Sequence, residues 1–502
     1  MKKTVRLFDE WRGMAPDNPR DRMSPNQVWR MEDLISRALG SSLESRQGWT
    51  YHVTSPLDGF VTAQIWANTL GGSHHLACTP NTLYNLDNPA APRVVAATPG
   101  ALWPMSTLYE YVLVPRTGDQ LPVIVRYAGQ TEVLVTTHAS TPKGRVAATW
   151  QSRFVLANTV ANANRLHFLS QEWVGGMTET PVWDPIAWWD TSADVTGLAT
   201  TRNSLIIFHE GTVERLRGTK APGAGVETDI WMEPLIGLGG CNEPHTICYW
   251  NDNVIFADAR GVYLTDGTTI RDVTSQGGVG REWRRAYDPA WRVSAGVVYD
   301  SYVIAMVDTT NNVFKKCFVC DLYSRNWTVF NNMPFSSFVA SIGERERMYG
   351  GGLDGKVANI STMWEESDPT IDTVDGNNVA VRPALETAWY RLGEDEGLKR
   401  VRNVYFSFDL AETNGMVKVY VCEQVQPRSP ADWILVKTLQ ENDLIDVNDQ
   451  PYTTNGYERR RIDIGRESYG FAFKLEVEGS IKNLKMYDLA AEVLPSREAT
   501  YA

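Results

Sequence analysis

A β-rich unit recurs along the chain at intervals of 36 to 51 residues, and this repeat restricts the fold more than any other feature. The clearest copies read Asn203-Ser-Leu-Ile-Ile-Phe followed by Gly211-Thr-Val-Glu-Arg-Leu, and Asn253-Val-Ile-Phe-Ala followed by Gly261-Val-Tyr-Leu-Thr. Asn and Gly tolerate the positive φ angles of tight turns, whereas β-branched and aromatic residues favour strands. Each copy is therefore predicted to contain a β-hairpin.

Seven copies can be aligned on one position near the start of each leading strand: His75, Tyr111, Phe154, Leu205, Ile255, Val303 and Met348. The successive spacings are 36, 43, 51, 50, 48 and 45 residues. An all-β unit of roughly 40–50 residues is typical of the four-stranded blades of a β-propeller. The pattern predicts an all-β fold with a β-propeller of about seven blades. A run of ordinary hairpins in two sandwiches is the alternative.

Composition along the chain divides it into four segments. Residues 1–50 are polar and rich in Pro, which predicts an extended N-terminal arm, with a short amphipathic helix expected at 31–43. The propeller is expected at 51–364, followed by an acidic linker at 365–378. Residues 379–502 hold short alternating strands that predict a β-sandwich domain, although one of these strands could instead complete the last blade.

The overall charge limits the classes of partner. Lys and Arg number 48 against 60 Asp and Glu, so the net charge is −12. Such a balance argues against a general nucleic-acid coat but not against a channel through which DNA slides without sticking. The six Cys are sparse, which indicates reduced thiols in a protein made in the cytosol. We expect no signal peptide and no membrane-spanning segment, because the chain shows no suitable apolar run.

The sequence shows few signs of known catalytic motifs. We find no Gly-x-Ser-x-Gly elbow, no phosphate-binding Gly-rich loop and no His-Glu-x-x-His pattern. Cys317 and Cys320 lie in an apolar strand pattern, where residues i and i+3 point to opposite faces, so they are poorly placed to chelate a metal. We therefore expect no catalytic residues, no metal and no cofactor.

An aromatic and acidic stretch is the first candidate site, formed by Trp183, Asp184, Trp188, Trp189 and Asp190. We expect it to be a loop at a protein interface, because Trp anchors such contacts and Asp favours turns. A glycosidase would need two carboxyl groups about 5–5.5 Å or 6.5–9.5 Å apart. The two Asp of this stretch are the best such pair in the sequence.

A basic cluster is the second candidate site, formed by Arg281, Trp283, Arg284 and Arg285. Arg side chains beside a Trp suit contacts to phosphates, so the cluster is a candidate for DNA contacts. The same charges would equally serve as salt bridges between subunits or as solvated loop charges.

The order of several motifs resembles the tail nozzle proteins of short-tailed bacteriophages, also called tubular tail or packaged-DNA stabilisation proteins. The matching stretches are Arg46-Gln-Gly-Trp49, Asn164-Arg-Leu-His-Phe-Leu-Ser170, Asp184-Pro-Ile-Ala-Trp-Trp189, and Val195 to Arg217, which contains Asn203-Ser-Leu-Ile-Ile-Phe-His-Glu-Gly-Thr-Val-Glu-Arg-Leu. The similarity covers about residues 40–360. Members of that family are often longer, with larger insertions.

The resemblance implies a structural virion protein of the phage tail, assembled in the host cytoplasm and without enzymatic activity. It would be a propeller-bearing homohexamer subunit below the head-to-tail adaptor protein. Its lumen would conduct genomic DNA without sequence specificity and help to retain and eject it, and its outside would receive tail fibres or spikes. Two other functions stay open: a propeller glycosidase or carbohydrate-binding protein, and a receptor-binding tail protein.

Overall fold

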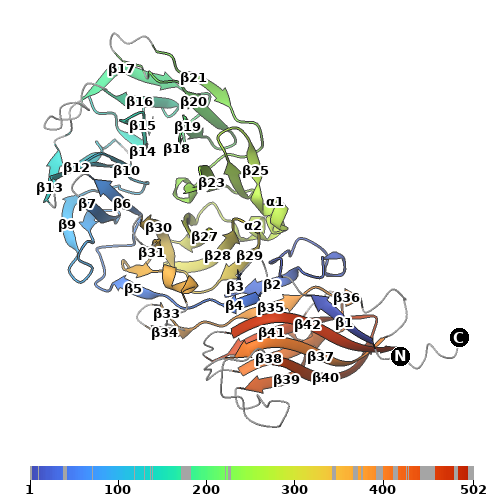
Figure 1. The fold of residues 1–502 in the computed structure, drawn as a ribbon. Coiled ribbons are helices and arrows are strands. Elements are labelled where there is room, and N and C mark those ends of the chain that lie inside the picture. Colours follow the sequence, from blue (N-terminus) through green and yellow to red (C-terminus); the bar gives the residue numbers. More distant parts are fainter. Residues whose placement is uncertain are drawn as a thin grey trace.

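The computed structural model describes most of the 502-residue chain. The described residues are 3–8, 11–37, 42–69, 72–117, 119–128, 131–135, 137, 140–170, 182–220, 222–223, 228–341, 346–365, 371–374, 377–391, 399–410, 416–425, 427, 429–440, 458–479 and 484–495. They form an all-β structure with many four-stranded sheets arranged around a common centre like the blades of a propeller (Figure 1). The prediction of an all-β fold with repeated sheets is confirmed. Within the described ranges, no helix is long and apolar enough to cross a membrane.

The four-stranded sheets follow one another along the chain, and we number them as units in that order. Unit 1 holds β6 (Ala63–Thr69), β7 (Gly72–Cys78), β8 (Thr82–Asn85) and β9 (Arg93–Ala97); unit 2 holds β10 (Ser106–Leu108), β11 (Tyr111–Val114), β12 (Val123–Ala128) and β13 (Thr131–Val135). Unit 3 holds β14 (Gly144–Trp150), β15 (Arg153–Thr159), β16 (Arg165–Leu169) and β17 (Trp183–Asp190); unit 4 holds β18 (Gly197–Thr201), β19 (Ser204–Phe208), β20 (Val213–Arg217) and β21 (Trp231–Pro234).

Three more units follow; the strands of unit 6 belong to a larger sheet, and unit 7 takes its fourth strand from before unit 1. Unit 5 holds β22 (Cys248–Trp250), β23 (Asn253–Ala257), β24 (Val262–Thr265) and β25 (Ile270–Asp272); unit 6 holds β26 (Arg292–Val298), β27 (Ser301–Asp308), β28 (Val313–Asp321) and β29 (Trp327–Phe330). Unit 7 holds β30 (Phe335–Ser341), β31 (Arg347–Gly352), β32 (Val357–Asn359) and β5 (Thr50–Val53). Helices α1 (Val273–Gly277) and α2 (Gly280–Ala286) link units 5 and 6.

The apolar runs of the repeat are the second strands of these units. All five residues of β19 and all eight residues of β27 are buried. Continuous burial follows because both faces of such a strand are covered by neighbouring sheets, which explains why these runs do not alternate with polar residues. Tight turns precede them: Asn251 and Asp252, at φ 45° and 60°, connect β22 to β23.

The last unit is completed by a strand from the N-terminal side of the chain. Strand β5 pairs antiparallel with β32, through Val53 opposite Val357, so the beginning and the end of the repeated region share one sheet. The alternative, in which one of the C-terminal strands completes the last unit, is wrong. Strand β5 comes just before unit 1, so this pairing joins the first and last units.

The C-terminal residues form two sheets that face each other (Figure 1). One sheet contains β35 (Ala384–Thr387), β36 (Tyr390–Arg391), β38 (Met416–Cys422), β39 (Ile434–Gln440) and β41 (Gly470–Glu478), and the other contains β37 (Lys399–Leu410), β40 (Glu458–Ser468) and β42 (Leu484–Pro495). The buried rings of Phe406 and Phe473, one from each sheet, meet at a centroid distance of 6.1 Å. Short 3-10 helices complete the description: η1 (Arg20–Arg22), η4 (Pro244–Thr246), η5 (Ser361–Trp364) and η6 (Pro430–Asp432).

Residues 1–50 are not an extended arm where the structure describes them. They supply β1 (Lys3–Phe8), β2 (Val28–Glu32), β3 (Leu34–Arg37) and β4 (Ser42–Ser45), all of which pair within the sheets. Strand β2 lies between β29 of unit 6 and β35, so one ten-stranded sheet runs from the propeller-like region into the C-terminal region. The N-terminal segment therefore joins the two parts of the molecule.

The helix expected at 31–43 is also absent from the described part of that range. Asp33 adopts φ 52°, in the left-handed region, and breaks the chain between β2 and β3. This turn buries both Met31 and Leu34, three residues apart. The resulting spacing of apolar residues imitates a helix although the backbone is extended.

The acidic linker expected at 365–378 is partly ordered as sheet. Its residues 366–370 and 375–376 lie outside the described residues, but β33 (Ile371–Val374) and β34 (Asn377–Ala380) form a hairpin. Asp372 on β33 is fully buried. This stretch is therefore a structural element and not only a connector.

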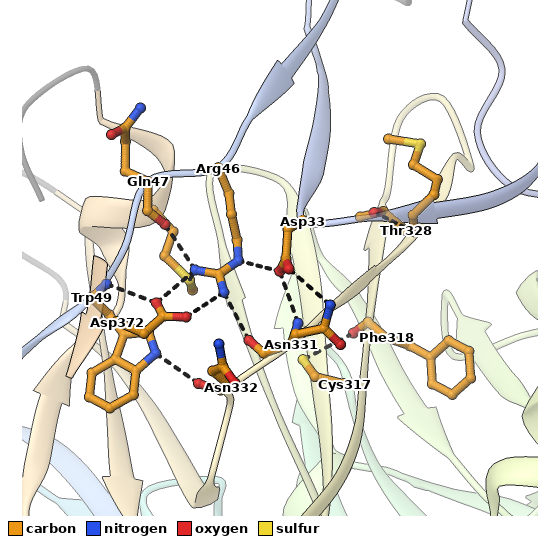
Figure 2. A network of polar contacts seen from close by, with 12 residues as sticks. Asp33, Arg46, Gln47, Trp49, Cys317, Phe318, Thr328, Asn331, Asn332 and Asp372 are labelled. Carbon is orange, nitrogen blue, oxygen red and sulfur yellow. Dashed lines mark hydrogen bonds and ion pairs between the residues drawn. The ribbon is translucent and has the colours of Figure 1, made fainter. Parts of the chain in front are cut away.

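Asp372 pairs with Arg46, which follows β4 (Figure 2). The guanidinium is fully buried, and each of its five N–H donors has an oxygen acceptor. The acceptors are Asp33 Oδ1 at 2.7 Å, the Gln47 carbonyl at 3.0 Å, Asp372 Oδ1 and Oδ2 at 2.8 and 2.7 Å, and the Asn331 carbonyl at 2.8 Å. Asp33 also accepts hydrogen bonds from the backbone and side-chain nitrogens of Asn331, both at 2.9 Å.

The charges of this buried network are stabilised by one another and not by solvent. Burial disfavours the Arg46 cation, but the two carboxylates of Asp33 and Asp372 more than offset it, so the pKa of Arg46 is raised. Burial raises the pKa of Asp372, and Arg46 acts against that rise. A buried ion pair of this kind contributes little net stability, yet removal of one partner leaves an uncompensated buried charge.

We predict that Arg46→Met lowers the free energy of unfolding by about 3–5 kcal/mol, because two buried carboxylates lose their cation. Urea denaturation followed by tryptophan fluorescence measures this loss. The triple variant Arg46→Met/Asp33→Asn/Asp372→Asn should be more stable than the single variant, because it removes the uncompensated charges.

The matched control is Arg202→Met, at an exposed position in the turn between β18 and β19, which should change stability by less than about 0.5 kcal/mol. A loss below about 1 kcal/mol for Arg46→Met would contradict a structural role for the network.

Candidate functional site

The basic cluster lies on the short helix α2, and its aromatic residue is part of the core. Trp283 is fully buried, donates a hydrogen bond from Nε1 to the Asp258 carbonyl at 2.9 Å, and contacts the Phe318 ring at a centroid distance of 5.4 Å. It therefore cannot contact DNA in this structure. Arg281, Arg284 and Arg285 are exposed, as a contact site requires.

Two of these arginines line a groove of about 460 Å³ where α2, the N-terminal segment and unit 6 meet. We call it the junction groove. Its cationic lining residues are Arg20, Arg30, Arg281, Arg285 and Lys316; its acidic ones are Asp17, Glu32 and Glu282; and Met14, Pro16, Trp29, Val329 and Pro427 complete it. The sequence pattern identified only the α2 arginines, because the other cations come from distant segments.

Several charges of the junction groove are already paired. Arg30 binds Glu32 through Nε at 2.7 Å and Nη2 at 2.8 Å, and Lys316 pairs with Glu282. The Asp17 carboxylate accepts hydrogen bonds from the backbone N–H of Arg281, at 2.7 and 2.9 Å. By contrast, the side chains of Arg281 and Arg285 have no ion-pair partner among the described residues.

Arg20 is the buried member of the groove. Its side chain is only 4% exposed, pairs with Glu386 through Nη2, and lies over the rings of Trp29 and Trp433, at 4.8 and 5.5 Å from their centroids. Nη1 is buried and has no hydrogen-bond partner within the described part of the chain. Burial lowers the pKa of Arg20, and Glu386 opposes this. The groove thus contains two exposed cations, Arg281 and Arg285, without an ion-pair partner among the described residues, which suits an anionic ligand.

The aromatic and acidic stretch is strand β17, the outer strand of unit 3, where we expected a loop. Trp183 is buried, Trp189 is half-buried and Trp188 is exposed. The Trp188 ring lies 3.7 Å from the Arg165 guanidinium, which also binds Asp190 at 2.6 and 3.0 Å. This hydrogen bond to Arg165 lowers the pKa of Asp190. The side chains of this strand hold two neighbouring strands together.

Asp184 and Asp190 are each engaged in contacts of their own. Asp190 binds Arg165, and Asp184 accepts a hydrogen bond from the Ile186 N–H at 3.0 Å. A glycosidase pair of carboxyl groups on this strand, with the spacing given above, stays a prediction. The stretch and the basic cluster lie apart, because β17 is in unit 3 and α2 follows unit 5 (Figure 1).

A second cavity, of about 300 Å³, lies at the centre of the propeller-like region. It is lined mainly by the first strands of units 1 to 5, including Ser106, Thr107, Thr149 and Thr200. The hydroxyl of Thr149 donates to the Thr107 carbonyl at 2.5 Å, and that of Thr200 donates to the Thr149 carbonyl at 2.6 Å. These bonds tie neighbouring units together at the cavity wall, whose other lining residues are mostly apolar.

Titratable side chains gather around η4, beside this cavity. Arg292 donates to the Ser336 carbonyl at 2.7 Å and also contacts His245, whose Nε2 donates to the Leu102 carbonyl at 2.7 Å. Tyr287 donates to Glu243 Oε1 at 2.9 Å. Burial lowers the pKa of Arg292 to about 10 and raises the pKa of Glu243 to about 7. No sequence motif pointed to these residues, because Glu243, His245 and Tyr287 come from connections between units and Arg292 begins β26.

The comparisons with known proteins give only distant likenesses. No protein-family model and no curated protein matches the sequence. Among solved structures, a computationally designed protein, Ika8, has a TM-score of 0.36 at 12% identity and covers 62% of this chain and 99% of its own. The extracellular domain of a one component system from B. thetaiotaomicron has a TM-score of 0.42 at 11% identity, covering 88% of this chain, which spans 63% of that domain.

A catalytically inactive virginiamycin B lyase from Staphylococcus aureus has a TM-score of 0.40 at 11% identity, covering 63% of this chain and 98% of its own. All three scores lie below 0.5. These likenesses therefore carry no conclusion about function.

We predict a pH-dependent contribution of Glu243 to stability. The folded protein keeps the Glu243 proton up to about pH 7, whereas an unfolded chain releases it near the ordinary value of 4.5. Between these values the folded state binds more protons, so the contribution of Glu243 falls as the pH rises. The difference in unfolding free energy between wild type and Glu243→Gln should fall by on the order of 2 kcal/mol from pH 4.5 to 7.5.

Urea denaturation at a series of pH values measures this difference. Glu210→Gln, at an exposed position, provides the control and should show no such fall. A difference that stays constant across this range, or rises with pH, would contradict the burial of the Glu243 carboxyl.

Proposed function

We propose that this chain is a structural subunit of the tail nozzle of a short-tailed bacteriophage. Its seven four-stranded units would form a seven-bladed propeller, and its two C-terminal sheets a β-sandwich. Six copies would form a ring below the head-to-tail adaptor, and DNA would pass through the ring. The motif resemblance suggests the virion role, and the surface of the chain supports a role in assembly.

An ordered apolar segment after unit 4 carries the proposal. Ile236 and Leu238 are 74% and 84% exposed, and Trp231 on β21 beside them is also exposed. The backbone of this segment is held, since the N–H of Ile270 donates to the Ile236 carbonyl at 2.8 Å. Large apolar side chains fixed at the surface are typical of sites that another protein covers.

The position of this segment suits a ring. It connects β21, the outer strand of unit 4, to unit 5, and Ile236 forms a bridge with Thr269 just before β25, the outer strand of unit 5. A heterologous contact pairs one surface with a different surface of the next copy, and such contacts close into rings. The rigid attachment of the C-terminal sheets through β2 would fix the angle between neighbouring copies.

The net charge of −12 is compatible with DNA passage. Each phosphate held by Lys or Arg adds attraction, so a conduit for DNA requires few such contacts along its wall. A chain with more acidic than basic residues meets this requirement.

We predict that the purified protein, mixed with its head-to-tail adaptor, forms six-fold rings visible by electron microscopy. The double variant Ile236→Asp/Leu238→Asp should abolish these rings, because it places charges in the covered surface, while the melting temperature stays close to wild type. Val160→Asp, another exposed apolar position, is the control. A protein that stays monomeric under all conditions would overturn the nozzle proposal, and rings formed by the double variant would exclude this segment from the interface.

A further inference from the structure

The junction groove has the features of a docking site that the nozzle proposal does not assign. We propose that it receives an acidic peptide segment of a partner protein. Carboxylates of that segment would bind Arg281 and Arg285, and Arg20 would add positive charge to the groove. This inference does not depend on ring formation.

Unpaired cations give the groove its affinity for carboxylates. Arg281 and Arg285 are four positions apart on α2, so their side chains leave the helix on the same side. Both line the groove, and neither has an ion-pair partner among the described residues. Two neighbouring guanidinium groups without an acceptor attract carboxylates and can bind them through paired hydrogen bonds.

Arg20 adds positive charge to the inner side of the groove. The two Trp rings and Glu386 hold its guanidinium in one orientation. Its Nη1 is buried and makes no hydrogen bond within the described part of the chain, as is true of several other buried side-chain atoms there. The direct contacts to a ligand therefore belong to Arg281 and Arg285, and Arg20 contributes through its charge.

The remaining lining favours a peptide over a nucleic acid. Asp17, Glu32 and Glu282 share the groove with the cations, so the fixed row of charges of a phosphate backbone would meet like charges, whereas a flexible peptide can turn its surplus carboxylates to solvent. A peptide can place single carboxylates on the free arginines and its other side chains elsewhere. Apolar residues of the groove, including Met14, Trp29 and Val329, suit such side chains.

The test uses the full chain and fluorescently labelled hexaglutamate as the probe, with anisotropy measured at low ionic strength. Hexaglutamate should bind saturably, and Arg281→Glu/Arg285→Glu should weaken binding at least about tenfold, because two attractive contacts become repulsive. Arg284→Glu is the matched control: it changes the same type of charge on the same helix, but Arg284 does not line the groove. It should weaken binding less than about threefold.

Labelled hexathymidylate of equal length distinguishes the two ligand classes. Tighter binding of hexathymidylate than of hexaglutamate would replace the peptide proposal by a nucleic-acid site. Failure of hexaglutamate to saturate, or equal loss in Arg284→Glu and the double variant, would overturn it as well. Circular dichroism checks the fold, and Arg281→Gln/Arg285→Gln replaces the double variant if that variant is unfolded. Ring formation depends on a different segment, so the two proposals fail separately.

Discussion

The buried Arg46 cation is the interaction on which the arrangement of this molecule depends. Its two carboxylate partners come from opposite ends of the propeller-like region: Asp33 precedes unit 1, and Asp372 follows unit 7. A third partner, the Asn331 carbonyl, lies between units 6 and 7. Because an unpaired buried charge is costly, these segments must lie together wherever Arg46 is buried. The network therefore fixes the closure of the repeated region together with the strand pairing between β5 and β32.

The same constraint explains how the two parts of the molecule are joined. Once Asp33 is bound to Arg46 and Asn331, strand β2 just before it is held beside β29, and β35 pairs with the other edge of β2. The outer strand of unit 6 is thereby covered, and no open edge is left there for unwanted pairing. The junction groove lies beside this strand, where the N-terminal segment passes α2. The groove is thus formed by the path of the N-terminal segment between the propeller-like region and the C-terminal sheets.

Local sequence patterns predicted the repeated sheets. They did not predict the strands of the N-terminal segment or the burial of Trp283, because both depend on contacts with distant residues. Runs such as 204–208 indicate a buried strand without further information, because β-branched and aromatic residues lie together between turns. The N-terminal segment gives no such signal, since β1 and β2 pair with residues about 300 or more positions away, as Glu32 does with Val329. The burial of Trp283 was unpredictable for a related reason: three exposed arginines surround it in the sequence, and the core that covers it comes from β28.

Arg46 and the groove arginines show how one residue type serves opposite purposes. Arg46 has an acceptor for each donor, so its guanidinium cannot bind a ligand as well. Replacement of Arg46 would lower the free energy of unfolding. Arg281 and Arg285 are exposed and have no ion-pair partner in the described chain, so their contribution to stability is small. A charge that is ordered or clustered but does not stabilise the fold is the stronger evidence for a binding site. Arg20 is intermediate between Arg46 and the groove arginines, because its Nη2 pairs with Glu386 whereas its Nη1 has no acceptor among the described residues.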